Sequence, residues 1–160
     1  MELLRADGLD AGYARTVAGW PDSPTEVALW CGRKDFPVPV DVVAGWRQAS
    51  DVEAYVLHED ADPVAYGELW VDTEESEVEL ARVIVAPGAR GRGVGRHLVA
   101  ELTVRARRTG LPDVYMRVHP DNAPALRCYR AAGFEPVAPE TAAQWNVRQP
   151  VAYVWLRHAG

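Results

Sequence analysis

Cysteine is scarce in this chain of 160 residues, which has only Cys31 and Cys128, far apart in the sequence. Two cysteines without a secretory leader are expected to be reduced thiols rather than a disulfide. The first residues, MELLRADGLDAG, lack the basic and apolar segments of a signal peptide. No apolar run approaches the ~20 residues that a membrane-spanning helix needs. We therefore expect a cytoplasmic protein with no membrane partner.

A basic excess is also lacking, because the formal net charge is −6 at pH 7. This argues against nucleic acid as a partner, since binding to a polyanion relies on clustered Lys and Arg. No His or Cys residues have the spacing of a metal site, so no metal is expected.

The charges that are present are unevenly distributed. Residues 51–81 hold eleven acids and no Lys or Arg, whereas residues 82–108 hold seven arginines and one acid. The basic block suits an anionic ligand, and the acidic block could attract a cationic amine. A solvated acidic hairpin is the simpler explanation for part of the acidic block.

Length and composition fit one domain over residues 1–160 with a substantial core. Hydrophobic periodicity and turn signals predict the following elements. Strands are expected over Glu2–Arg5, Val52–Glu59, Val64–Val71, Glu77–Val85, Val114–His119, Phe134–Val137 and Val151–Arg157. Helices are expected over Leu9–Trp20, Thr25–Cys31 (capped by Ser23, with Glu26 completing a capping box), Asp41–Ala49 (capped by Asp41), Val94–Arg108 and Asn122–Ala132, with a loop over Pro139–Pro150. This order predicts a mixed sheet with helices on both faces.

Residues 90–95 read Arg-Gly-Arg-Gly-Val-Gly, between the strand that ends at Val85 and the helix that begins at Val94. A glycine-rich turn that leads into a helix N-terminus forms an anion site, because the first helical N–H groups have no internal partners. Glycines also let the backbone approach phosphate oxygens closely. The arginines add positive charge. The sequence therefore predicts a ligand that carries a phosphate or pyrophosphate.

The spacing excludes two common nucleotide motifs. A P-loop closes on Lys-Ser or Lys-Thr, and this loop has neither. The dinucleotide fingerprint is G-x-G-x-x-G, whereas the glycines here are Gly91, Gly93 and Gly95. The pattern that remains is Arg90-x-x-Gly93-x-Gly95. Taken alone, it is also compatible with a tight turn whose arginines are solvated.

A second motif follows the strand Val114–His119: Asn122-x-x-Ala125-x-x-x-Tyr129-x-x-x-Gly133-Phe134. Together, the arginine–glycine loop and this asparagine–tyrosine segment resemble the two signatures of the GCN5-related N-acetyltransferase (GNAT) superfamily. They occur in the family's order and cover roughly residues 77–137.

The resemblance implies an α/β (α+β) fold with a mostly antiparallel sheet. In it, two central parallel strands, here Glu77–Val85 and Val114–His119, splay apart to admit the pantetheine arm of acetyl-CoA. The arm would pair with exposed backbone of the first strand. The implied acetyl-CoA residues are Val83, Ile84, Val85, Arg90, Gly91, Arg92, Gly93, Val94, Gly95, Arg96 and Asn122.

Tyr129 matches the family's tyrosine near the CoA sulfur and is the candidate general acid. A phenol suits this role because its ordinary pKa of ~10 is not far above that of a thiol. The competing interpretation is that Tyr129 only packs its helix. An acyl-enzyme on Cys128 is a further alternative, although Cys128 points about 100° away from Tyr129 around the helix.

Glu79 and Glu68 are the candidate general bases, on adjacent predicted strands. A carboxylate with an ordinary pKa of ~4.3 needs burial or a neighbouring acid to act near pH 7. The two could supply this for each other if their strands pair in a suitable register. A water chain, or an amine that arrives neutral, would serve instead.

These features together predict an N-acetyltransferase that moves acetyl from acetyl-CoA directly to a primary amine in a ternary complex. A small-molecule acceptor is expected, and a closed pocket walled by Trp20, Trp30 and Trp46 would favour it. A peptide or protein N-acetyltransferase and a non-catalytic CoA-binding regulatory module remain as alternatives. The resemblance is compatible with a monomer or a homodimer.

Overall fold

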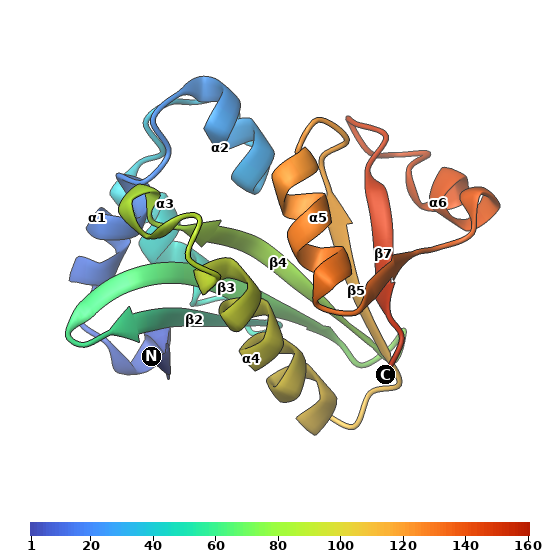
Figure 1. Cartoon of the computed structure of the whole chain (residues 1–160), viewed down its shortest axis with the longest axis horizontal. Helices are drawn as coiled ribbons and strands as arrows, with labels where there is room; N and C mark the ends of the chain where they lie inside the picture. The colour runs from blue at the N-terminus through green and yellow to red at the C-terminus, as the bar shows by residue number, and fades with distance from the viewer.

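A seven-stranded sheet in the order β1-β2-β3-β4-β5-β7-β6 forms the centre of the computed structural model, which describes residues 1–160 (Figure 1). Its strands are β1 (Glu2–Arg5), β2 (Val52–Glu59), β3 (Asp62–Asp72), β4 (Glu77–Val85), β5 (Asp113–Val118), β6 (Phe134–Pro136) and β7 (Val154–His158). The helices are α1 (Gly12–Ala18), α2 (Pro24–Cys31), α3 (Val40–Trp46), α4 (Val94–Arg108), α5 (Ala123–Ala131) and α6 (Pro139–Trp145), with 3₁₀ turns at Ala6–Gly8 and Pro87–Ala89. None of these helices is both long and apolar enough to cross a membrane.

Only β4 and β5 are parallel, and they separate part-way along their length. Their pairing ends at Leu80 opposite Met116, whereas β3 stays paired with β4 as far as Val85. At the point of separation the register between β3 and β4 shifts, and Arg82 takes a left-handed backbone conformation with φ +49°. The predicted mixed sheet with a splayed parallel pair is thereby confirmed.

The sheet carries a hydrophobic core on each face. Alternate residues of β2 show the division, because Tyr55 and Leu57 join one core while Ala54 and Val56 join the other. The first core includes α4 and α5, and the second includes α1, α2 and α3. Helix α4 approaches β3 closely at Gly67, where a Cβ atom would lie 2.8 Å from Leu102 Cδ1.

Several predicted boundaries are confirmed and others are wrong. The strands Glu2–Arg5, Val52–Glu59 and Glu77–Val85 and the helix Val94–Arg108 have the predicted bounds. Ser23 does cap α2, since its hydroxyl accepts from the Glu26 N–H at 3.1 Å. The capping box is incomplete because the Glu26 carboxylate pairs with Arg90 instead.

Four expectations in the helical and C-terminal regions are corrected by the structure. Helix α3 begins at Val40, so Asp41 lies in its first turn and does not cap it. Helix α1 covers only Gly12–Ala18 of the expected Leu9–Trp20. The expected loop after β6 contains helix α6. None of its residues is fully buried, which is why its sequence shows no clear helical periodicity. The last strand begins at Val154, after a turn in which the Tyr153 N–H donates to the Val151 carbonyl.

Candidate active site

Two cavities meet where β4 and β5 separate. The larger has a volume of about 650 Å³ and the smaller about 150 Å³. Five residues line both cavities, and two of them belong to the predicted asparagine–tyrosine motif. The shared residues are Leu29, Trp30, Val83, Asn122 and Tyr129.

The glycine-rich loop lines the larger cavity. Gly91 and Gly93 both have φ +79°, a left-handed conformation that favours glycine, and a Cβ atom at either position would meet only open space. Gly93 directly precedes α4 and has no side chain to cap the helix, so the first N–H groups of α4 lack a side-chain partner. This geometry gives an open backbone cradle at the positive end of a helix dipole.

The arginines of the loop point in different directions. Arg90 and Arg96 line the larger cavity. Arg90 donates to the Val85 carbonyl at 3.1 Å and pairs with Glu26 of α2 at 3.1 Å. Arg92 does not line it and instead pairs with Glu59 at the end of β2.

Other predicted cofactor residues also lie around the larger cavity. Val83, Ile84 and Val85 line it, on the part of β4 that has no pairing with β5. Gly95 and Val94 line it at the start of α4. Asn122 caps α5, since its Oδ1 accepts from the Ala125 N–H at 3.3 Å. The Asn122 side-chain N–H₂ has no protein partner and is available to a ligand.

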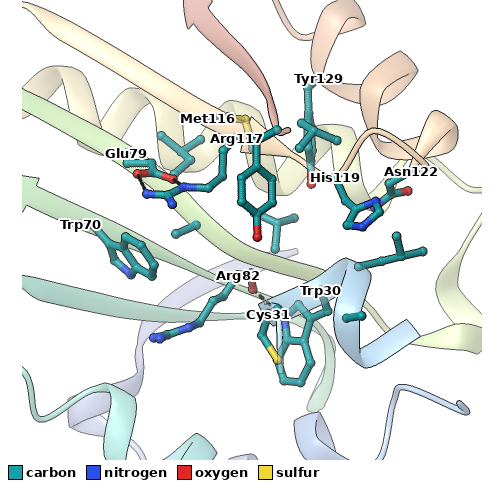
Figure 2. Close-up of a pocket in the computed structure, with 18 residues that line it drawn as sticks. Trp30, Cys31, Trp70, Glu79, Arg82, Met116, Arg117, His119, Asn122 and Tyr129 are labelled. Carbon is teal, nitrogen blue, oxygen red and sulfur yellow. Dashed lines mark hydrogen bonds and ion pairs between the residues drawn. The ribbon is translucent and has the colours of Figure 1, made fainter. Parts of the chain in front are cut away.

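Tyr129 projects from α5 into the smaller cavity (Figure 2) and also lines the larger one. Its side chain is buried, and its hydroxyl makes no hydrogen bond with another protein group. Burial, and then the neighbouring Cys128 thiol, raise the pKa of Tyr129. The phenol therefore stays protonated and its O–H is free to donate.

The smaller cavity contains Glu79 in a tight ion pair with Arg117 of β5 (Figure 2). The Nε and Nη2 groups of Arg117 donate to the two Glu79 oxygens at 2.7 and 2.8 Å. Arg117 Nη1 also donates to Gln149 at 3.3 Å. Both carboxylate oxygens thus have a charged donor.

Glu68 does not line either cavity and is fully buried. Its carboxylate accepts from the Tyr66 hydroxyl, from Trp70 Nε1 at 2.8 Å and from Arg82 Nη1 at 2.9 Å. In the observed register Glu68 lies opposite Ala81, and Glu79 lies opposite Trp70. Each of the two acids therefore has an arginine as its charged partner.

Three arginines that line the cavities were not predicted. Arg82 and Arg117 line the smaller cavity, and Arg127 lines the larger. A single arginine among the apolar and aromatic residues of a predicted strand, as in LARVIV and VYMRV, was the signal that could have identified the first two. Helix α2 also contributes Trp30 to both cavities, whereas Trp20 lies in the core formed by α1, α2 and α3.

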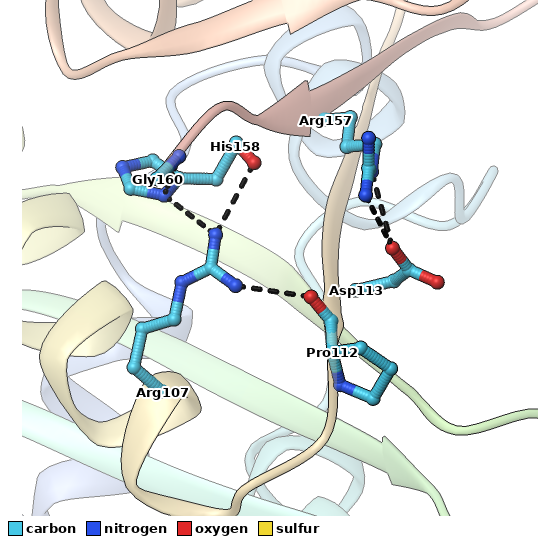
Figure 3. Close-up of polar contacts among 6 residues, drawn as sticks. All are labelled: Arg107, Pro112, Asp113, Arg157, His158 and Gly160. Atoms are coloured by element: carbon cyan, nitrogen blue, oxygen red, sulfur yellow. Dashed lines mark hydrogen bonds and ion pairs between the residues drawn. The ribbon is translucent and has the colours of Figure 1, made fainter.

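The strand that carries Arg117 is supported by β7, and β7 is tied to α4 (Figure 3). Arg107 Nη2 lies 2.9 Å from His158 Nδ1 and donates to the His158 carbonyl at 3.2 Å. Its Nη1 donates to the Pro112 carbonyl at 3.1 Å. Burial and then the Arg107 charge lower the pKa of His158, because the proton would sit beside a guanidinium group.

Replacement of His158 by glutamine is expected to reduce the dependence of stability on pH. The unfolded chain takes up the histidine proton at pH ~6.5, whereas the folded chain takes it up only at a lower pH. The stability contributed by this group is therefore present above pH ~6.5 and is lost as the pH falls through the lowered folded pKa. Urea unfolding at pH 7.5 and 5.5 measures the effect, with His97→Gln as control. If the free energy of unfolding falls by the same amount between pH 7.5 and 5.5 in both variants, His158 is not the source of the pH dependence.

No group of three or more His, Cys, Asp or Glu residues is arranged to hold a metal ion.

The comparison with known proteins agrees with the geometry of the two cavities. A family model described as the acetyltransferase (GNAT) family matches residues 15–134. The chain belongs to the GNAT family of acetyltransferases. The family predicted from the two motifs is thus confirmed.

Curated relatives share part of this chain. A mycothiol acetyltransferase of Brachybacterium faecium is 37% identical over 146 residues, which are 84% of this chain and 42% of that protein. A streptothricin acetyltransferase of Streptomyces lavendulae is 32% identical over 75 residues, 47% of this chain and 40% of that protein. The chain thus spans less than half the length of these relatives.

Solved structures show that the GNAT fold extends over nearly the whole chain. AAC(6')-Ib in complex with paromomycin and acetyl-CoA aligns with a TM-score of 0.74 at 18% identity, covering 98% of this chain and 91% of that one. A ribosomal-protein-alanine N-acetyltransferase from Brucella melitensis aligns with a TM-score of 0.71 at 20% identity, covering 98% of both chains.

Proposed function

We propose that this GNAT domain transfers acetyl from acetyl-CoA directly to a primary amine of a small molecule in a ternary complex. The observation that carries the proposal is the position of Tyr129, where a large cavity with an anion cradle meets a small polar cavity. Two reactants held on either side of this junction would be adjacent, and such positioning supplies much of the acceleration of a bimolecular reaction.

The larger cavity fits acetyl-CoA, which supplies an activated thioester. The open backbone at Gly91 and Gly93, with Arg90 and Arg96, would hold the pyrophosphate. The unpaired edge of β4 at Val83–Val85 offers backbone hydrogen bonds to the amide-bearing arm. Arg92 would take part only after leaving Glu59.

Tyr129 is proposed as the general acid that donates its proton to the departing thiolate. Its raised pKa keeps it protonated throughout the physiological range, and its hydroxyl has no competing protein partner. Asn122, which lines both cavities beside it, would orient the ligand with its free amide N–H₂ group.

The proton of the ammonium acceptor must leave before attack, and Glu79 is favoured over Glu68 as the base. Glu79 lines the smaller cavity, although both of its oxygens are held by Arg117, so a bridging water is the proposed carrier. Glu68 is enclosed and has no access to either cavity. Its proposed role is to hold Arg82.

Direct transfer is favoured over an acyl-enzyme because neither thiol suits a nucleophile. Burial raises the pKa of Cys128, which lines the larger cavity, and burial likewise raises the pKa of Cys31 in the smaller one. A raised pKa leaves little of the reactive thiolate at neutral pH.

A small acceptor is favoured by the volume of the acceptor cavity, about 150 Å³. The names of several relatives, mycothiol, streptothricin and aminoglycoside acetyltransferases, point to small molecules as well. The fold likeness to ribosomal-protein-alanine N-acetyltransferases keeps a peptide acceptor as the second candidate.

Release of free CoA thiol from acetyl-CoA tests the proposal, with polyamines, aminoglycosides, amino acids and short peptides as acceptors. We expect one class of small amine to stimulate release. Initial rates with both substrates varied should give intersecting double-reciprocal lines, as a ternary complex requires. Parallel lines would indicate an acyl-enzyme instead, and stimulation by peptides alone would favour the second candidate.

A further inference from the structure

The guanidinium group of Arg82, a residue that lines the smaller cavity, is fixed by two aromatic rings and one carboxylate. Its guanidinium carbon lies 4.1 Å from the centre of the Trp46 ring and 4.9 Å from that of Trp70. The same group donates to the buried carboxylate of Glu68 at 2.9 Å. Stacking and pairing together fix the orientation of the guanidinium plane before any ligand arrives.

The backbone of Arg82 is constrained as well. Its φ of +49° is uncommon for a residue other than glycine, and the Trp30 indole N–H donates to its carbonyl at 2.9 Å. A conformation of this kind costs free energy and tends to persist where a functional site depends on it. Arg82 lines the cavity that also contains Glu79 and Tyr129, and its side chain extends toward Trp70, another lining residue (Figure 2).

Most of the hydrogen-bonding capacity of Arg82 is not used within the protein. Only Nη1 donates to a protein group, and Nε and Nη2 have no protein acceptor. The Arg82 nitrogen atoms that lack a protein partner are accessible to solvent or to a ligand. A guanidinium group has five N–H donors in a fixed plane that matches the two oxygens of a carboxylate.

The neighbouring Arg117 differs, because its Nε, Nη1 and Nη2 groups each donate to a side-chain oxygen. Two aromatic rings that line the cavity, those of Trp70 and Tyr153, already lie beside the protein's own cations. Arg82 lies 4.9 Å from the centre of the Trp70 ring, and Arg117 lies 5.7 Å from the centre of the Tyr153 ring. The cavity therefore offers little to a second cationic group and a free donor edge to an anionic one.

We propose that Arg82 binds a carboxylate of the acceptor, so that the acceptor is an amino carboxylic acid rather than a simple amine or polyamine. This inference rests on the proposed function, because it names the acceptor class for the same cavity. Carboxylate and guanidinium would form a paired, charge-assisted contact that fixes the amine relative to Tyr129.

Matched acceptors that differ only by the carboxylate test the inference: tryptophan with tryptamine, phenylalanine with 2-phenylethylamine, and lysine with cadaverine. We expect wild-type kcat/KM to favour at least one amino acid over its decarboxylated partner by about 10- to 100-fold. Arg82→Gln should remove this preference and Arg82→Lys should restore part of it. Arg157→Gln, which breaks an ion pair with Asp113 outside both cavities, should preserve it.

A binding measurement separates this inference from the proposed function. Calorimetric titration of the CoA-bound protein with N-acetyltryptophan, N-acetylphenylalanine and N-acetyllysine should show binding that Arg82→Gln weakens. N-acetyltryptamine should bind weakly to both proteins. Binding of this kind without turnover would support the carboxylate site while refuting the proposed catalysis. Turnover of the decarboxylated amines at the same kcat/KM as the amino acids would overturn the carboxylate site and leave acetyl transfer intact.

Discussion

Tyr129→Phe is expected to lower kcat by about 100-fold or more while changing the Kd of acetyl-CoA by less than about twofold. General acid catalysis typically contributes 10²- to 10⁴-fold, and the substitution removes only the hydroxyl. The ring remains in the core beside α4 and the sheet, so folding should be preserved. Stopped-flow or steady-state CoA release, together with calorimetric titration of acetyl-CoA, measures the two quantities separately.

Tyr115→Phe is the matched control, because Tyr115 lies on β5 but packs against Trp145 outside both cavities. Its kcat should stay close to the wild-type value. The pH profile adds a second check. Since burial raises the pKa of Tyr129, wild-type turnover should show no loss attributable to this group up to about pH 10. Unchanged kcat in Tyr129→Phe would refute the assignment of the acid.

Gly93→Glu is expected to weaken acetyl-CoA binding by at least about 100-fold. The new carboxylate would stand in the open space of the cradle, where a pyrophosphate is proposed to bind, and like charges in contact cost several kcal/mol. The left-handed backbone adds strain to any side chain at this position. Calorimetric titration with acetyl-CoA and with CoA measures the loss.

Gly110→Glu separates the strain and the added charge from the loss of the cradle. Gly110 has the same φ of +79°, is exposed, and has open space around its missing Cβ atom, but it follows the other end of α4. The two variants should therefore have similar melting temperatures and very different acetyl-CoA affinities. Equal affinities would show that the glycine loop is not the pyrophosphate site.

The geometry of the proposed cofactor side could be predicted because its signals are local. A glycine turn at the start of an amphipathic helix places its N–H groups in one direction whatever the rest of the chain does. Val94, Leu98 and Leu102 recur at helical spacing, and all three are buried. The loop therefore faces the splayed strands.

The proposed acceptor side could not be predicted in the same way because its contacts depend on strand register. The carboxylates of Glu68 and Glu79 could have influenced each other in a suitable register, but the observed register gives each an arginine partner, Arg82 and Arg117. The bulge that turns Arg82 inward is likewise invisible in the sequence, since nothing in ELARVIV marks a left-handed residue. Helix α6 escaped prediction for a different reason, because none of its residues is fully buried.

Helix α2 is a common wall of the two cavities, through Leu29 and Trp30, and its Glu26 is paired with Arg90 of the glycine loop. A ligand in the larger cavity that binds Arg90 in place of Glu26 would change a contact of α2. Helix α2 also lines the smaller cavity, where the second ligand would bind. The two binding equilibria are then linked through one element. By thermodynamic reciprocity, whatever factor acetyl-CoA imposes on acceptor affinity, the acceptor must impose on acetyl-CoA affinity.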